Sequence, residues 1–90
     1  MSNGINPELW EFPVDYTLKV MGLASAPLTE IVTQIVLTHA PDFDATRVSI
    51  RASSSGKYHS VTALVYLTHK EQVEGIYRDL HAHPDIVMTL

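Results

Sequence analysis

The order in which strand-like and helix-like patterns follow one another constrains the fold of this chain more than any other feature. Apolar and polar residues alternate in residues 14–21, which is the period of a half-buried strand. Residues 28–39 carry apolar side chains three and four positions apart, a spacing that only a helix brings to one side. Both patterns return further along, as alternation in 47–53, 61–67 and 85–90 and as a helical stripe in 73–80. The predicted order is β-α-β-β-α-β.

Four strands and two helices in this order predict an α+β fold, the ferredoxin-like sandwich. Right-handed crossovers then give a four-stranded antiparallel sheet of order 4-1-3-2 with both helices on one face. Residues 61–67 are apolar on both faces toward their end, which is typical of a central strand. We expect a single domain over residues 14–90, preceded by an N-terminal lead-in segment, residues 1–13.

Local signals refine the second helix. Thr68 and Glu71 fit a capping box, in which the hydroxyl and the carboxylate each satisfy an amide at the helix start. Gly75 lies inside the helical stripe and costs about 1 kcal/mol relative to alanine, so we expect close packing there. Pro84 ends this helix, as Pro41 ends the first.

Strand alternation predicts which side chains face the helices. In the outer strands, Ile50 and Met88 are expected to point inward. We call the opposite side of the sheet the open face. Its expected members are Thr17, Lys19, Met21, Arg47, Ser49, Arg51, Thr62, Leu64, Tyr66, Val87 and Thr89. Because this face mixes apolar groups with cations, two interpretations stay open: a solvated surface, or a contact surface for another subunit, protein or anionic ligand.

A polar segment centred on glycine separates the second and third strands. Serines bond their own backbone in turns and Gly56 adopts a positive φ without a steric penalty, so residues 53–61 are predicted to form a hairpin tip. The segment carries the densest group of potentially functional side chains. Together with residues of the open face it gives our candidates for ligand or partner binding: Lys19, Arg51, Gly56, Lys57, Tyr58, His59 and Tyr66.

Several motifs resemble those of the YbeD-like proteins, a family of small bacterial proteins without an established biochemical activity. They are Glu11-Phe12-Pro13, Lys19-Val20-Met21-Gly22, Ser55-Gly56-Lys57-Tyr58-His59-Ser60-Val61, and Thr68-His69 with Glu71-Gln72-Val73-Glu74. The resemblance runs from about residue 11 to residue 90. It implies a ferredoxin-like fold, similar to that of ACT-type regulatory domains, which bind small effectors, often amino acids. It implies no catalytic residue.

The hairpin segment does not match a nucleotide-binding loop. The first glycine is missing, Tyr58 follows Lys57 where serine or threonine is needed, and a strand follows where a helix is needed. A looser anion site, made of loop amides with Lys57 and Arg51, stays open beside the interpretation as a solvated turn.

Catalytic and metal chemistry find little support in the sequence. There is no cysteine, so disulfides, a thiol nucleophile and cysteine-ligated zinc are excluded. His81 and His83 are two positions apart and do not share a helical face. No nucleophile-elbow pattern orders the serines, histidines and acids. We therefore expect no enzyme activity, no metal and no cofactor. The alternative is a small enzyme or enzyme accessory with a site near Lys57-Tyr58-His59.

Charge and hydropathy limit the partners. A net charge of −4 argues against nonspecific binding to nucleic acid or an anionic membrane. The open face has one expected aromatic residue, Tyr66, and no RNP-like run. No apolar run approaches the roughly 20 residues of a membrane span, and no signal peptide is recognisable. We expect a cytoplasmic protein that binds a protein partner or a second copy through the open face, or a small anionic or amino-acid-like ligand.

Overall fold

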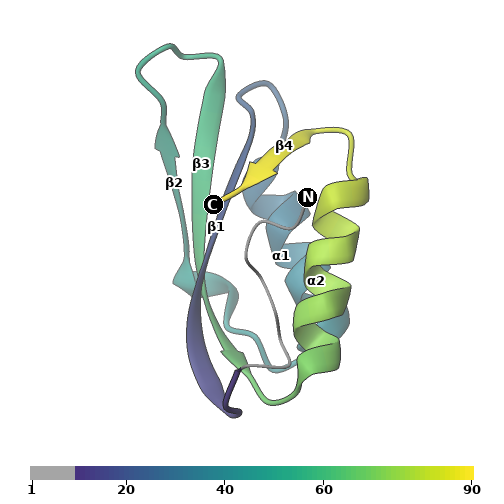
Figure 1. Cartoon of the computed structure of the whole chain (residues 1–90). Coiled ribbons are helices and arrows are strands. Elements are labelled where there is room, and N and C mark those ends of the chain that lie inside the picture. Colours follow the sequence, from purple (N-terminus) through teal and green to yellow (C-terminus); the bar gives the residue numbers. More distant parts are fainter. Residues whose placement is uncertain (1–9) are drawn as a thin grey trace.

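The computed structural model describes residues 10–90 and has two layers, a sheet and a pair of helices packed on one side of it (Figure 1). The elements are β1 (Val14–Leu23), α1 (Leu28–His39), the 3-10 turn η2 (Ala45–Arg47), β2 (Val48–Ala52), β3 (Tyr58–Leu67), α2 (Lys70–Ala82) and β4 (Ile86–Thr89). This confirms the predicted β-α-β-β-α-β order.

The sheet is antiparallel throughout and its strand order is β2-β3-β1-β4, as predicted. Its centre is the pairing of β1 with β3, which runs from Val14 opposite Leu67 to Leu23 opposite Tyr58. Strand β3, which is apolar on both faces, is central as predicted, because β1 pairs with one of its edges and β2 with part of the other.

The core lies between the two central strands and the helices. The alternate residues of β1 and β3 that were predicted to face inward meet the apolar stripes of α1 and α2 there. The largest fully buried members are Leu18, Val20, Val61, Val65, Leu67, Leu28, Val32, Val36, Val73 and Leu80. Burial of large aliphatic side chains at the expected positions confirms both periodicities.

The outer strand β2 departs from the expected burial. Ile50 lies opposite Val61 and so on the predicted side of the sheet, yet 47% of it is exposed. The core is centred on β1 and β3, and the helices do not cover the outer part of β2. The register confirms that Ile50 points to the helix side, and its exposure shows that alternation determines the side of a strand but not whether another element covers it.

In β4 the predicted alternation is wrong after the first residue. The register shifts between Met21 and Gly22, so that Gly22 lies opposite Ile86 while Met21 lies opposite Met88. One extra residue on β4, Val87, reverses the sides of the residues that follow. Met88 thus lies on the open face, where 47% of it is exposed.

The same register shift also moves Thr89 to the opposite face from the one predicted. It was expected on the open face, but it lies opposite the buried residue Val20. Its hydroxyl is 3.3 Å from Nε2 of His81 on α2, on the helix side of the sheet. The bulge thus exchanges an apolar residue and a polar residue between the two faces at this end of β4.

The two helices approach each other closely at Gly75, as expected. A Cβ placed on Gly75 would overlap the imidazole ring of His39, at the end of α1. That ring is also fixed from the other side, since His39 Nε2 lies 2.6 Å from Asp79 Oδ2. The hydrogen bond from His39 lowers the pKa of the Asp79 carboxyl. The missing side chain at position 75 therefore makes room for a histidine–aspartate pair between the helices.

The first residues that the structure describes pack back on the domain. The ring centroid of Trp10 lies 4.8 Å from that of Tyr16, and the hydroxyls of Tyr16 and Tyr77 are 2.7 Å apart in a hydrogen bond. Trp10 thus contacts the domain itself. Residues 1–9 of the predicted lead-in lie outside the described residues.

Replacing Gly75 with alanine tests the helix contact. Helix propensity favours alanine by about 1 kcal/mol, whereas overpacking typically costs about 1–3 kcal/mol. Because the imidazole of His39 cannot move without breaking its bond to Asp79, we expect Gly75→Ala to lower the free energy of unfolding in urea. In a His39→Ala background the imidazole is absent, and Gly75→Ala should then raise the free energy of unfolding. Glu74→Ala, on the exposed side of α2, is the matched control; stabilisation by Gly75→Ala in both backgrounds would contradict this contact.

The Tyr16–Tyr77 hydrogen bond predicts a loss of stability in alkali. Burial, followed by the hydrogen bond to Tyr16, raises the pKa of the Tyr77 hydroxyl above its usual value of about 10. A group whose pKa is raised in the folded state contributes stability below its unfolded pKa and loses it as the pH rises further. We expect the free energy of unfolding to fall above about pH 10 in the parent protein and to fall less in Tyr77→Phe. Tyr66→Phe, at an exposed position, is the control; equal slopes in all three proteins would refute the assignment.

Candidate functional site

The open face is built from rows of side chains that cross the strands. One row runs from Arg51 through Ser60 and Met21 to Met88, and the next contains Ser49, Thr62 and Lys19. Further along, Leu64 pairs with Thr17 and Tyr66 pairs with Asp15. Leu64 and Tyr66 are 40% and 54% exposed. The register therefore confirms the open-face placement of the predicted residues that are paired in β1, β2 and β3. Arg47 precedes β2, in the turn η2, and its placement is not tested by the register.

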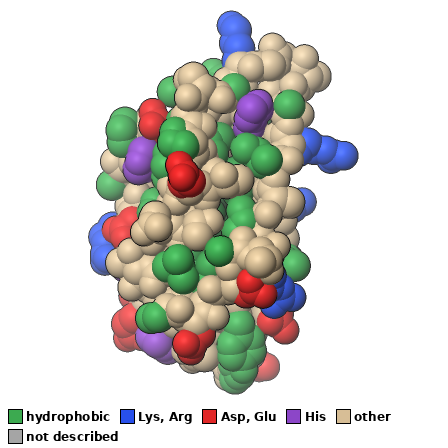
Figure 2. Space-filling view, turned by 180° about the vertical axis from the view of Figure 1, so that it is seen from behind, with side chains coloured by type: hydrophobic (Ala, Val, Ile, Leu, Met, Phe, Trp, Pro, Cys, Tyr) green, Lys and Arg blue, Asp and Glu red, His purple; other side chains and the backbone are tan. Residues whose placement is uncertain are grey.

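Positive charge gathers on the sheet side of the molecule. Lys and Arg side chains line the border that lies on the right in Figure 2, and this border corresponds to the sheet in Figure 1. Lys19, Arg47 and Arg51 are exposed, and Asp15 lies on the same face. An acidic chain thus presents a surface on which cations outnumber acids.

The hairpin tip has the predicted geometry. Gly56 adopts φ 77°, and its amide donates to the carbonyl of Ser53 at 3.1 Å. The amide of Ser53 donates to the carbonyl of Tyr58 at 3.0 Å and closes the turn. Lys57 is exposed at the tip, and its carbonyl accepts a hydrogen bond from Ala24.

The candidate residues of this segment do not converge. Tyr58 lies opposite Leu23, at the end of the open face, whereas His59 lies opposite Gly22, on the helix side. Successive residues of a strand point to opposite faces, so the two side chains diverge. Tyr66 is also distant from Arg51, because the partner of Arg51 is six residues before Tyr66 on β3, about 20 Å along the strand. The seven candidates are thus spread over the tip and both faces.

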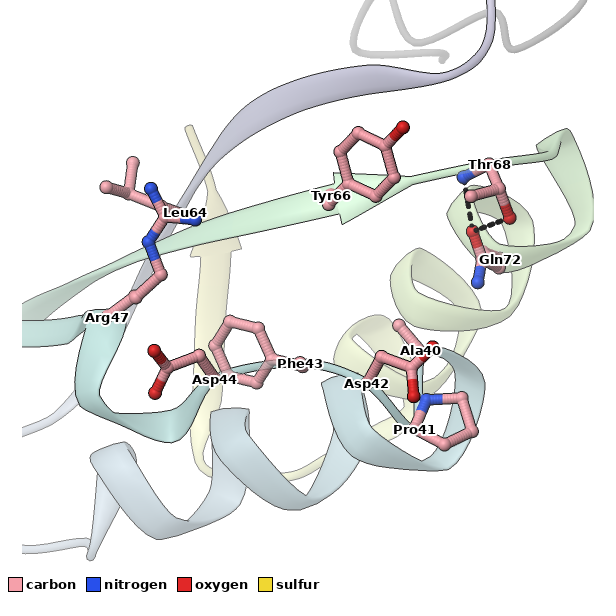
Figure 3. A pocket seen from close by; sticks show the side chains of 10 residues that line it. All are labelled: Ala40, Pro41, Asp42, Phe43, Asp44, Arg47, Leu64, Tyr66, Thr68 and Gln72. Carbon is pink, nitrogen blue, oxygen red and sulfur yellow. Dashed lines mark hydrogen bonds between the residues drawn. The ribbon is translucent and has the colours of Figure 1, made fainter.

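The structure reveals a hollow that the sequence did not predict, beside the last residues of β3. It has a volume of about 220 Å³ and lies between β3 and the connection from α1 to β2 (Figure 3). Its lining combines both signs of charge with apolar and aromatic groups: Ala40, Pro41, Asp42, Phe43, Asp44, Arg47, Leu64, Tyr66, Thr68 and Gln72.

The wall of the hollow made by the connection is held by a local side-chain cap. Asp44 Oδ1 accepts from the backbone amide of Thr46 at 2.9 Å and from its hydroxyl at 2.6 Å, which starts the turn η2. These hydrogen bonds lower the pKa of the Asp44 carboxyl, and the charge of Arg47 adds to the effect. Asp44 therefore stays ionised at neutral pH and gives this wall a fixed negative charge.

The end of the hollow is closed by Gln72, and here the predicted capping box is wrong. The side-chain oxygen of Gln72 accepts from the backbone amide of Thr68 at 2.7 Å (Figure 3). Its side-chain nitrogen donates to the carbonyl of His39 at 3.2 Å. The helix cap is His69, which makes no side-chain capping bond. Gln72 can do this because position 72 faces the end of α1, whereas Glu71 is exposed.

Two sequence signals could have indicated this site. The run Asp44-Ala45-Thr46 has the aspartate-to-amide spacing of a turn that begins at Asp44. Gln72 lies next to the apolar position Val73 in the helical stripe, and a polar residue there suggests a buried hydrogen bond. Neither signal shows that the two segments meet beside β3.

The part of the chain that the structure describes is residues 10–90. This part of the chain contains no group of three or more potential metal-ligating side chains. Neither of its helices is long and apolar enough to cross a membrane.

Comparisons with known proteins identify relatives over nearly the whole chain. A family model described as "Protein of unknown function (DUF493)" matches residues 7–90. The UPF0250 protein NE1487 of Nitrosomonas europaea is 40% identical over 82 residues, which cover 91% of this chain and 94% of the relative. The UPF0250 protein of Paraburkholderia phytofirmans is 36% identical over 88 residues, with 98% and 99% covered.

A solved structure has the same fold. The solution structure of protein HP0495 from H. pylori matches with a TM-score of 0.67 and covers 100% of this chain and 93% of its own. The sequences are 14% identical, so this likeness concerns the fold alone.

Proposed function

The chain belongs to the DUF493 family, which confirms the resemblance to the YbeD-like proteins, and from that premise we propose that it is a non-enzymatic regulatory or interaction module that binds a protein partner through the open face of its sheet. The observation that carries this proposal is the composition of the open face. Apolar side chains lie there between exposed cations, whereas the chain as a whole is acidic.

The apolar part of the face would supply the buried centre of such an interface. Met21 and Met88 are opposite each other at one end, and Leu64 and Tyr66 follow each other along β3 toward the other. Methionine side chains are flexible and adapt to varied partner surfaces. Tyrosine and methionine are also enriched in interfaces relative to the rest of a protein surface.

The charges would select the partner. Lys19 and Arg51 flank the methionine pair, and Arg47, at the end of η2, lines the hollow with Leu64. Cations on this face favour an acidic partner surface and speed its association through electrostatic steering. The proposed partner is therefore a protein with an acidic rim around an apolar centre. The same cations would also attract a small anionic or amino-acid-like effector of the kind that ACT-type domains bind.

An enzymatic role near the hairpin tip receives less support. A catalytic set needs side chains within hydrogen-bond reach of one reacting group. Tyr58 and His59 point to opposite faces of the sheet, and Lys57 is exposed at the turn. These positions do not favour a shared site.

Charge reversal on the open face tests the proposal. We expect Lys19→Glu combined with Arg51→Glu to weaken capture of partner proteins from a lysate of the source cells by about tenfold, which corresponds to about 1.4 kcal/mol. Quantitative mass spectrometry of proteins retained on the immobilised parent and variant would measure this. Arg78→Glu, on the exposed side of α2, is the matched control.

Two results would argue against the proposal. One is a partner set that is unchanged by reversal on the sheet and lost by reversal on α2. The other is a parent protein that retains no partner and sediments as a monomer. Self-association of the parent that is abolished by reversal on the open face would identify the partner as a second copy.

A further inference from the structure

Within residues 10–90, no strand pairs with the last part of β3 on one of its sides. Pairing with β2 extends from Ala52 opposite His59 to Val48 opposite Ala63 and ends there. Pairing with β1 on the other side continues to Leu67. We call residues 64–67 of β3 the free edge segment. It borders the hollow through Leu64 and Tyr66.

The register indicates which backbone groups of this segment point into the hollow. The hydrogen bond from the amide of Ser53 to the carbonyl of Tyr58 shows that Tyr58 directs its backbone groups toward β2. Successive residues of an antiparallel strand direct these groups to alternate sides, so every second residue after Tyr58 points the same way. Tyr66 is one of them. Its amide and carbonyl therefore point toward the hollow, while those of Val65 and Leu67 point toward β1.

Thr68 is the next residue of β3 and its continuation whose backbone groups point to this side, and its amide has a hydrogen-bond partner. Thr68 directs its amide to the same side, and the side-chain oxygen of Gln72 accepts its hydrogen bond at 2.7 Å. Gln72 thus takes the position that a neighbouring strand would fill. Between β2 and Gln72, the ladder is interrupted at the position of Tyr66.

The connection from α1 does not fill this interruption. Its backbone hydrogen bonds close on the connection and on α1: Phe43 donates to Ala40, and Arg47 donates to Asp44, each at 3.0 Å. It runs beside β3 at the far side of the hollow (Figure 3). The space between them is about 220 Å³.

We propose that the hollow is a binding site for an extended peptide segment of a partner protein, which pairs with β3 at Tyr66 as an added antiparallel strand. One peptide residue exchanges both of its backbone hydrogen bonds with Tyr66, in the manner of β-strand addition. Its side chain lies on the open face, beside the exposed side chains of Leu64 and Tyr66. An apolar residue suits that position.

Charge complementarity predicts the peptide residues on either side of this apolar residue. The wall opposite β3 presents the carboxylates of Asp42 and Asp44, both exposed. The one cation among the lining residues, Arg47, lies at the Leu64 end of the hollow (Figure 3). One oxygen of Asp44 is used by Thr46, which leaves its other oxygen for a ligand. Lysine or arginine residues flanking the apolar residue would pair with these acids. The preferred segment is thus basic–apolar–basic.

This proposal does not depend on the function proposed above. The two sites share Leu64, Tyr66 and Arg47 but depend on different charges. The hollow attracts cations through Asp42 and Asp44, whereas the open face attracts acids through Lys19 and Arg51. A protein whose partner binding resists charge reversal at Lys19 and Arg51 could still bind a basic peptide at Tyr66. Conversely, a protein that does not bind a basic peptide at Tyr66 could still lose its partner on charge reversal at Lys19 and Arg51. Each experiment therefore tests one proposal without deciding the other.

Hydrogen exchange of the free protein provides the first test. Because the amide of Tyr66 points into the hollow, we expect it to exchange with solvent deuterium at least tenfold faster than the amides of Val65 and Leu67, as measured by NMR. Equal protection of all three would show that the position is already occupied and would overturn the proposal.

Peptide titration provides the second test. The probe is the capped tripeptide acetyl-Lys-Val-Lys-amide, followed by chemical shifts of the backbone amides in ¹⁵N-labelled protein. We expect saturable shifts centred on Tyr66 and residues 42–44 and slower exchange of the Tyr66 amide. Methylation of the valine nitrogen removes one backbone donor and should weaken binding roughly fivefold or more. The acetyl-Glu-Val-Glu-amide peptide should not compete.

Asp42→Asn with Asp44→Asn is the matched protein variant. Asparagine keeps the oxygen that caps η2, so the turn is retained while the negative charge is lost. We expect weaker binding of the lysine peptide with unchanged exchange at Tyr66 in the free variant. Absence of saturable shifts at Tyr66 with any peptide, equal binding of the N-methylated probe, or the same shifts with free lysine or valine would each overturn the proposal.

Discussion

The pairing of β1 with β3 is the interaction on which the rest of the structure depends. Each strand contributes ten residues to it, and their alternate side chains form the sheet side of the core. Because this ladder joins residues far apart in the sequence, it fixes the positions of both crossover helices, which bury its apolar side. The helices then contact each other at Gly75, where the His39–Asp79 pair lies. Burial of aliphatic side chains against these strands is the main source of stability for such a sheet.

The outer strands are shorter than the central pair, and the features available for recognition follow from that difference. β2 covers only part of β3, so a segment of β3 borders the hollow without a neighbouring strand. β4 joins β1 through a bulge, which brings Met88 to the open face opposite Met21. The face that the helices leave uncovered thereby carries apolar side chains among its cations. The two recognition surfaces that we propose lie where an outer strand or the helices leave the central strands uncovered.

The candidate site was predicted less completely than the fold. The sequence indicated the open face and the hairpin tip, and register confirms the positions of Lys19, Arg51 and Tyr66 on that face. It did not indicate that Tyr58 and Arg51 are remote from Tyr66, or that Asp42 and Gln72 lie near it. Residues within one strand are related by a simple period, whereas residues on a loop and a helix meet only through the packing of both on the sheet. Gln72 illustrates this, because its two hydrogen-bond partners are on different elements.

By itself, the sequence determined the order of the elements, the strand order, the central position of β3 and the buried faces of both helices. These follow from local periodicity together with the handedness of crossovers, and both can be inferred without coordinates. Only the tertiary structure decided the exposure of Ile50, the reversal at Met88 and Thr89, and the hollow beside Tyr66. Each of these depends on where a neighbouring element ends or shifts its register by one residue. Such an ending or shift is a property of two packed segments, and neither segment encodes it alone.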